Sequence, residues 1–195
     1  NPQAGNENGG VRKIRDLIIY KDPVFYSSFP SVIKNESGEI IVAFRRAPDR
    51  KIFNEKGNSH VDPNSYIVFV RSKDNGQTWT KEPELLFAHP FGGSQDPCLL
   101  KINNATILCT SYIWAFLRES GIQNLKPPVS KNMEGSVFMG GYIVRSEDNG
   151  ISWEGPFEPP GIPPEVRLSA IGEALPAYNR GALCEGSDGR LFWVV

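Results

Sequence analysis

The sequence predicts an all-β fold assembled from repeated units of four antiparallel strands. Three observations lead to this prediction: an eight-residue turn signature that occurs twice, a hairpin pattern that occurs three times, and a composition unsuited to long helices. The 195 residues include 19 glycines and 16 prolines, and no long stretch repeats its apolar residues at helical spacing. Because repetition along a chain dictates architecture, these repeats define the expected fold.

The turn signature reads S-x-D-N-G-x-(S/T)-W and occupies residues 72–79 and 146–153. Each copy follows an apolar stretch that ends in Arg-Ser, at Arg71 and at Arg145. In turns, Asp and Asn bond to nearby backbone amides, Gly supplies a positive φ, and Trp folds back over the loop. We therefore expect each copy to form a rigid turn between the outer two strands of a sheet, with both arginines facing outward.

A short apolar run, a polar turn and a second apolar run together predict a β-hairpin. This pattern recurs at residues 29–44, 96–111 and 180–195. In the first unit the hairpin is followed by a third apolar strand at 66–71, the turn signature, and a fourth strand at 84–87. Four antiparallel strands per repeated unit are typical of the blades of a β-propeller.

The repeats also predict the boundaries of the units. A closed propeller needs at least about four blades, and the third hairpin reaches the last residue. We therefore expect the chain to be the N-terminal half of a longer protein whose C-terminal half completes the propeller; a stand-alone sandwich of three units is the alternative. The expected segments are a flexible N-terminus over 1–13, a propeller part over 14–195, blade one at about 26–90, blade two at about 95–165, and the start of blade three at about 178–195.

The composition limits the classes of partner and cofactor that we expect. The net charge of −1 and the pI of about 6.2 argue against a nucleic-acid partner, and no window is apolar enough to span a membrane. The three cysteines lack the spacing of a metal site, and Cys98 and Cys109 fall in strand-like runs, where buried thiols are expected. No metal and no cofactor are predicted.

The turn signature resembles the Asp-box of sialidases (neuraminidases) and related BNR-repeat propellers. In those families the boxes lie on the blade periphery, far from the sugar site, so the resemblance concerns the scaffold first. Sialidases are six-bladed, which implies that this chain covers about three blades. The resemblance further implies a secreted, periplasmic or cell-surface exo-glycosidase that removes a terminal acidic sugar, sialic acid, from glycoconjugates.

The resemblance also implies roles for charged residues near the propeller axis. In sialidases an arginine triad binds the sugar carboxylate, an Asp protonates the leaving oxygen, and a Tyr assisted by a Glu is the nucleophile. By position, Asp62 matches the acid and Arg46 a substrate-binding arginine, while Asp96 before Pro97 matches an Asp-Pro that contacts the sugar ring. An acid must hold its proton near the working pH, so we expect burial against Pro63 to raise the pKa of Asp62.

Five further residues are candidates for the site. Arg45 precedes Arg46 in a strand, so the two face opposite sides and at most one points into the pocket. His60 is one of two histidines and shares a loop with Asp62, where it either transfers protons or merely bonds to the loop. Trp114 either stacks on a sugar or fills the core. Substrate-binding candidates at the start of the third unit are Arg180 and Glu185.

Two positions depart from the sialidase pattern. Ser28 stands where those enzymes begin blade one with the first triad arginine, and Arg180 stands near the position of the Glu that assists the Tyr. Glu185 fits that role only with a shifted alignment. Two alternatives therefore stay open: a propeller glycoside hydrolase for another sugar, with His60 in proton transfer, and a non-catalytic glycan-binding propeller.

Overall fold

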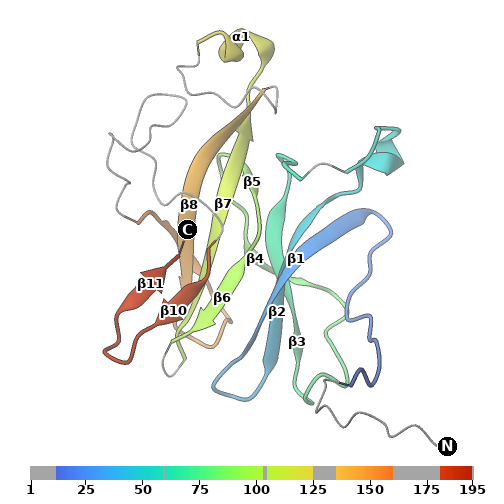
Figure 1. Ribbon diagram of the computed structural model, residues 1–195. Coiled ribbons are helices and arrows are strands. Elements are labelled where there is room, and N and C mark those ends of the chain that lie inside the picture. The colour runs from blue at the N-terminus through green and yellow to red at the C-terminus, as the bar shows by residue number, and fades with distance from the viewer. Residues whose placement is uncertain (1–11, 59, 103–104, 125–134, 160–180, 195) are drawn as a thin grey trace, which may run out of the picture.

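The computed structural model describes residues 12–58, 60–102, 105–124, 135–159 and 181–194 (Figure 1). The fold is all-β with antiparallel sheets, as the sequence predicted. Within the described residues the helical segments are a short α-helix, α1 (Glu119–Ile122), and a 3-10 turn, η1 (Arg50–Phe53). Neither of these described helical segments has the length or apolarity to cross a bilayer.

The first sheet contains four antiparallel strands in sequence order. They are β1 (Phe25–Lys34), β2 (Ile40–Pro48), β3 (Tyr66–Ser72) and β4 (Glu84–Phe87). Strands β2 and β3 are rich in β-branched and aromatic residues, which favour extended backbone, and they are buried along most of their length. The register of β1 against β2 shifts between Ser28 and Ser31, where Phe29 has a φ of 56°. This irregularity bends the end of β1.

The second sheet repeats the four-strand order, and the third is a hairpin. The second contains β6 (Cys98–Lys101), β7 (Ile107–Phe116), β8 (Ser136–Ser146) and β9 (Glu154–Phe157), and the short β5 (Gly93–Ser94) pairs with the far end of β7. The hairpin consists of β10 (Leu183–Glu185) and β11 (Leu191–Trp193). Contacts join β1 to β6 and β6 to β10, so the first strands of the three units are neighbours (Figure 1). This radial order of antiparallel sheets is typical of propellers.

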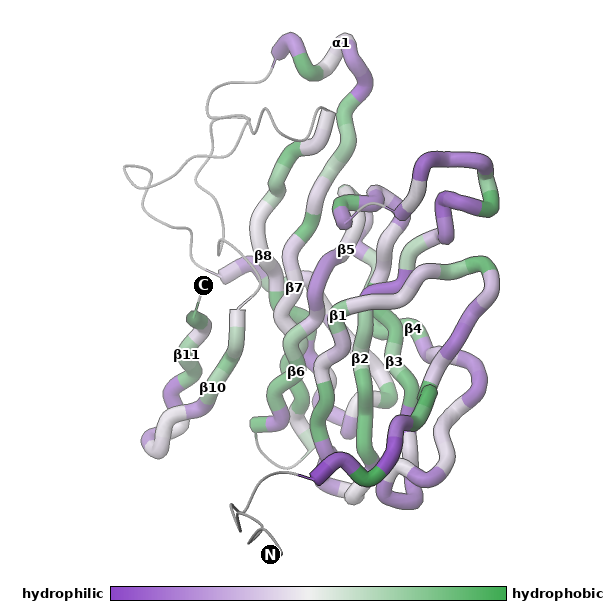
Figure 2. Tube along the Cα trace, turned by 45° about the vertical axis from the view of Figure 1, so that its right-hand side comes forward, coloured by the Kyte–Doolittle hydropathy of each residue, from purple (hydrophilic) through white to green (hydrophobic). Residues whose placement is uncertain are grey.

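The hydrophobic core lies between the first two sheets. Figure 2 shows hydrophobic residues concentrated on their strands, with hydrophilic residues mainly on the connecting loops. Ile41 and Phe69 of the first sheet belong to the same buried cluster as Ile107 and Val144 of the second, and each is at most 1% exposed. Removing this apolar surface from water holds the two sheets together as one body.

Both copies of the turn signature form the same hydrogen-bonded loop, joining β3 to β4 and β8 to β9. The Ser72 hydroxyl donates to Asp74 Oδ1 at 2.8 Å, and Ser146 donates to Asp148 Oδ1 at 2.8 Å. Each Asp also accepts backbone N–H groups from the residues three and four positions later. Asn75 adopts a φ of 56° between these groups. The prediction of rigid turns between outer strands is confirmed.

These hydrogen bonds make the turns sensitive to acid. Burial raises the pKa of Asp148, but hydrogen bonds from Ser152 and Ser146 outweigh it and lower that pKa to about 2. A carboxylate whose pKa is lowered by folding stabilises the protein above its unfolded pKa of 3.8, and this contribution is lost as the pH falls towards about 2. Asp148→Asn should therefore reduce the difference between urea unfolding midpoints measured at about pH 6 and about pH 2.

Glu147→Gln is the matched control, because it changes an exposed carboxylate of the same turn. It should leave the parent's acid dependence in place. An Asp148→Asn protein that loses as much stability in acid as the parent does would contradict the assignment.

Arg71 and Arg145 differ, although they occupy equivalent positions before the two turns. The Arg145 side chain is 41% exposed and pairs with Glu154, so its predicted outward orientation is confirmed. The Arg71 side chain is 8% exposed, and its Nη2 donates to the carbonyl of Gly150 in the second turn. The prediction for Arg71 is wrong, because the packing of the two sheets brings the second turn against the end of β3.

Candidate functional site

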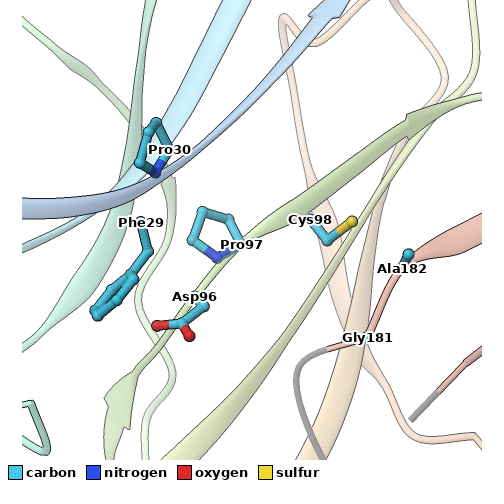
Figure 3. Close-up of a pocket in the computed structure, with 7 residues that line it drawn as sticks. All are labelled: Phe29, Pro30, Asp96, Pro97, Cys98, Gly181 and Ala182. Atoms are coloured by element: carbon cyan, nitrogen blue, oxygen red, sulfur yellow. The ribbon is translucent and has the colours of Figure 1, made fainter.

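A pocket with a volume of about 420 Å³ opens where the first strands of the three units, β1, β6 and β10, meet (Figure 3). These are called the inner strands. The pocket is lined from β1 by Phe29 and Pro30, from the start of β6 by residues 96–98, and from the approach to β10 by Gly181 and Ala182. Figure 3 shows the Asp96 carboxylate and the Phe29 ring on the same side of the pocket. A concave site of this size is large enough to bind a small ligand.

Asp96 links the pocket to a cluster of polar side chains. The Tyr112 hydroxyl donates to Asp96 Oδ2 at 3.4 Å and lies 3.3 Å from His60 Nε2. Arg45 is fully buried, and the ionisable groups that act on its charge include Tyr26, Asp62, Asp96 and Tyr112. Burial lowers the pKa of Arg45, while those neighbouring charges act in the opposite direction. Residues from three separate segments of the chain therefore share one electrostatic environment.

The structure places Arg45, and not Arg46, in this cluster. Arg46 lies on the opposite side of β2, where its Nη2 is 2.7 Å from Asp22 Oδ2 and its Nη1 donates to the Tyr66 hydroxyl at 2.7 Å. Its guanidinium also lies 3.6 Å from the centre of the Phe25 ring. The expected opposite orientation of the two arginines is confirmed. The assignment of Arg46 to substrate stays a prediction, and the described contacts of this side chain are with the scaffold.

Asp62 is buried, but it is held as an ion pair. Its carboxylate accepts Arg50 Nε at 2.6 Å and Arg50 Nη2 at 2.9 Å, and it also accepts the Asn64 amide at 2.8 Å. Burial raises the pKa of Asp62, but these bonds outweigh burial and bring it below its usual range. The expectation that burial against Pro63 raises this pKa is therefore corrected. Arg50 is one of the residues that sequence reasoning missed, together with Tyr112 and Phe29.

His60 lies at the exposed edge of the cluster. Its ring meets the Phe29 ring edge-on, with 5.0 Å between centroids. Phe29 is the residue with positive φ at the irregularity in β1, a backbone conformation that costs a non-glycine residue roughly 1–3 kcal/mol. Such strain is concentrated at functional sites, and here it presents an aromatic ring to both His60 and the pocket.

The loop that carries His60 and Asp62 is anchored from behind by β5. The Ser65 hydroxyl lies 2.9 Å from the carbonyl oxygen of Asp62 and 2.7 Å from that of Ser94, and its single proton can be donated to either. Gly93 packs against the same loop, where an added Cβ would overlap the carbonyl oxygen of Asp62 and lie 2.7 Å from Ser65 Oγ. The close approach of β5 therefore requires glycine at this position.

Gly93→Ala should destabilise the protein by about 1–3 kcal/mol, because the loop or β5 must move to accommodate the methyl group. The free energy of unfolding in urea measures this change. Gly121→Ala is the control, because its Cβ would make an ordinary contact of 3.6 Å with Leu117. Equal stabilities of the two variants would contradict the tight packing of β5 on the loop.

Of the remaining sequence candidates, Trp114 and Glu185 lie outside the cluster. Trp114 packs against Phe138, with 5.3 Å between ring centroids, and Phe138 in turn contacts Tyr112. Glu185 is exposed on β10. Arg180 falls outside the described residues. Cys109 is buried as predicted, whereas Cys98 is only half-buried and lines the pocket.

Comparisons with known proteins agree on the fold. No protein-family model and no curated protein matches the chain. A protein of unknown function from Dyadobacter fermentans, known from a crystal structure, is 61% identical over 92% of this chain with a TM-score of 0.85. The match covers 49% of that protein, so this chain spans about half the length of its relative.

Two more distant structures share the fold at low identity. A Hadza microbial sialidase, Hz136, matches 87% of this chain and 32% of its own at 18% identity, with a TM-score of 0.54. Zg3597, a family 117 glycoside hydrolase from the marine bacterium Zobellia galactanivorans, matches 88% of this chain and 48% of its own at 14% identity, with a TM-score of 0.55. The chain thus has a propeller-type all-β fold of the kind these glycan-active enzymes possess.

Proposed function

We propose that the protein is an exo-acting glycoside hydrolase that removes a terminal sugar from a glycan. The observation that carries the proposal is the arrangement of Asp96, Tyr112 and His60 beside a pocket between the inner strands. Glycoside hydrolysis needs a group that exchanges a proton with the glycosidic oxygen or water, and polar groups that hold the ring. The shared fold with a sialidase and a family 117 glycoside hydrolase supports the same class of substrate.

In this proposal each side chain has a role set by its position. His60 moves the proton, because it is the exposed titratable group of the cluster. Asp96 lines the pocket and accepts hydrogen bonds from sugar hydroxyls. Asp62 stays ionised and holds Arg50, which keeps the His60 loop in place. This replaces Asp62 as the acid with the alternative in which His60 transfers the proton.

The terminal sugar is either sialic acid or another, neutral sugar. A terminal sialic acid is the sugar that the family resemblance implies, although the turn signatures that carry this resemblance concern the scaffold. Another terminal sugar is favoured by one observation: none of the described residues that line the pocket is Lys or Arg, and Arg45 is fully buried. Binding a sugar carboxylate with cations would therefore need residues beyond this described lining, whereas a neutral sugar requires none.

A substrate panel tests the proposal on the intact protein. Hydrolysis of 4-methylumbelliferyl α-N-acetylneuraminide is compared with that of neutral 4-nitrophenyl glycosides and reducing-end-labelled oligosaccharides. We expect the protein to hydrolyse one class of substrate and to release the sugar from the non-reducing end. The His60→Gln variant should lose this activity. Saturable glycan binding without turnover, unchanged in His60→Gln, would instead support a non-catalytic glycan-binding propeller.

The two interpretations of Asp62 make different predictions for Asp62→Asn. If the side chain holds Arg50, as proposed, the variant should lose about 2 kcal/mol of unfolding free energy, because Arg50 is left without its buried charged partner. The kcat of this variant should fall only to the extent that the loop carrying His60 is displaced. Unchanged stability with a loss of turnover of about 100-fold or more would identify Asp62 as the acid after all.

A further inference from the structure

Tyr112 occupies a central position that the proposed function does not yet explain. Its hydroxyl lies between Asp96 Oδ2 at 3.4 Å and His60 Nε2 at 3.3 Å. The side chain is 4% exposed, and its ring packs against Phe138 with 5.9 Å between centroids. A buried and packed ring fixes the position of its hydroxyl, so the contacts with Asp96 and His60 are set by the scaffold.

The protons available on Tyr112 and His60 limit how these side chains can hydrogen-bond to one another and to Asp96. A tyrosine hydroxyl has one proton to donate, and an ionised carboxylate can only accept. Hydrogen bonds to a charged acceptor are roughly twice as strong as those between neutral groups, so the Tyr112 proton points to Asp96. The Tyr112 oxygen is then an acceptor towards His60. For this contact to be a hydrogen bond, His60 must carry a proton on Nε2.

A neutral imidazole has one N–H group, so a proton on Nε2 leaves the lone pair on Nδ1. In the opposite arrangement Tyr112 would donate to His60, and Asp96 would lose the hydrogen bond from Tyr112. The fully buried Arg45 guanidinium lies in the same environment and favours negative charge on Asp96 over positive charge on the nearby ring. Both effects favour the tautomer with the proton on Nε2.

We propose that Tyr112 is a positioning residue that holds His60 as the Nε2–H tautomer and thereby makes Nδ1 the atom that exchanges protons with substrate or water. This inference rests on the proposed function only in giving His60 a proton-transfer role. Asp96 then acts in two ways: it faces the pocket, and through Tyr112 it sets the proton on His60.

Nitrogen-15 NMR of the imidazole ring tests the proposal without any substrate. The intact protein is labelled with ¹⁵N-histidine and studied at about pH 8.5, where an ordinary histidine is neutral. The His60 signals are assigned by their loss in His60→Gln. We expect the parent to show a single tautomer, with a proton on Nε2 and a lone pair on Nδ1. A parent ring with the proton on Nδ1 would overturn the proposal.

Two variants probe the mechanism from opposite directions. Tyr112→Phe removes the acceptor for Nε2–H, so the two ring-nitrogen shifts should move towards each other as the second tautomer becomes populated. Asp96→Ala frees the Tyr112 proton for His60 Nε2, so the Nδ1–H tautomer should increase. Tyr26→Phe is the matched control, because the Tyr26 ring also faces Arg45 but, among the described residues, it has no hydrogen bond or ring contact with His60. Its spectrum should equal the parent's.

Activity provides a second measurement. Tyr112→Phe should lower kcat about tenfold with KM nearly unchanged, because the wrong tautomer reduces the active fraction without altering sugar contacts. Parent-like spectra in both Tyr112→Phe and Asp96→Ala would overturn the role of Tyr112. If the tautomer shifts as expected but no glycan is hydrolysed, the proposed function fails while the positioning of His60 stands.

Discussion

His60→Gln should lower kcat by about 100- to 10,000-fold while leaving the free energy of unfolding close to that of the parent. Glutamine retains a polar side chain of similar reach but cannot take up and release a proton near neutral pH. The stability should change little, because the His60 side chain is exposed. Steady-state kinetics on the substrate found in the panel, together with urea unfolding, measure both quantities.

The other histidine of the chain provides the control. His89 is half-buried against Tyr142 and Phe87, away from the pocket lining, and His89→Gln makes the same chemical change there. Its kcat should stay within about twofold of the parent. Equal loss of turnover in both variants would show that glutamine acts through the fold, and undiminished turnover in His60→Gln would remove His60 from the mechanism.

Arg71→Met should cost about 3–5 kcal/mol of unfolding free energy, the largest stability effect expected here. The Arg71 guanidinium donates to the carbonyls of Asn149 and Gly150 in the second turn, and it pairs with Glu39 at 3.2 Å and Glu84 at 3.0 Å. Methionine keeps the apolar stem but leaves the buried Gly150 carbonyl and the partly buried Glu39 carboxylate without their charged donor. The loss of unfolding free energy therefore arises at the junction between the first two sheets.

Arg145→Met tests whether the effect comes from burial or from the position before a turn signature. Arg145 occupies the equivalent position in the second unit, but its side chain is 41% exposed and its partners are carboxylates at the surface. This variant should cost at most about 1 kcal/mol. Similar losses in both variants, measured by urea unfolding at one pH, would contradict the described role of Arg71 at the sheet junction.

The local structure was predictable because its causes are local. Within each turn signature the donors and acceptors lie two to four residues apart, so the spacing of Ser, Asp and Gly is enough to predict the loop. The alternation of apolar runs and polar turns likewise predicts hairpins. The position of Asp96 at the start of an inner strand was also accessible to sequence reasoning, since the unit repeats.

The site chemistry was not predictable, because it depends on residues that only folding brings together. Tyr112 and His60 lie 52 positions apart, and whether their side chains meet depends on how the loop before β3 packs on β7. Asp62 looked like a buried acid until the structure paired it with Arg50, which reverses the direction of its pKa shift. The sequence also could not distinguish which of Arg45 and Arg46 faces the cluster.

The sequence by itself determined the all-β class, the hairpins and the two rigid turns, because each follows from short-range hydrogen bonds and the period of the apolar residues. Only the tertiary structure decided the direction of Arg71, the ion pair of Asp62 with Arg50, and the trio of Asp96, Tyr112 and His60. Charge and hydrogen-bond energies depend on distance and burial, and both are set by how separate units pack. These interaction energies can therefore be assessed only from the structure in which the sheets are packed.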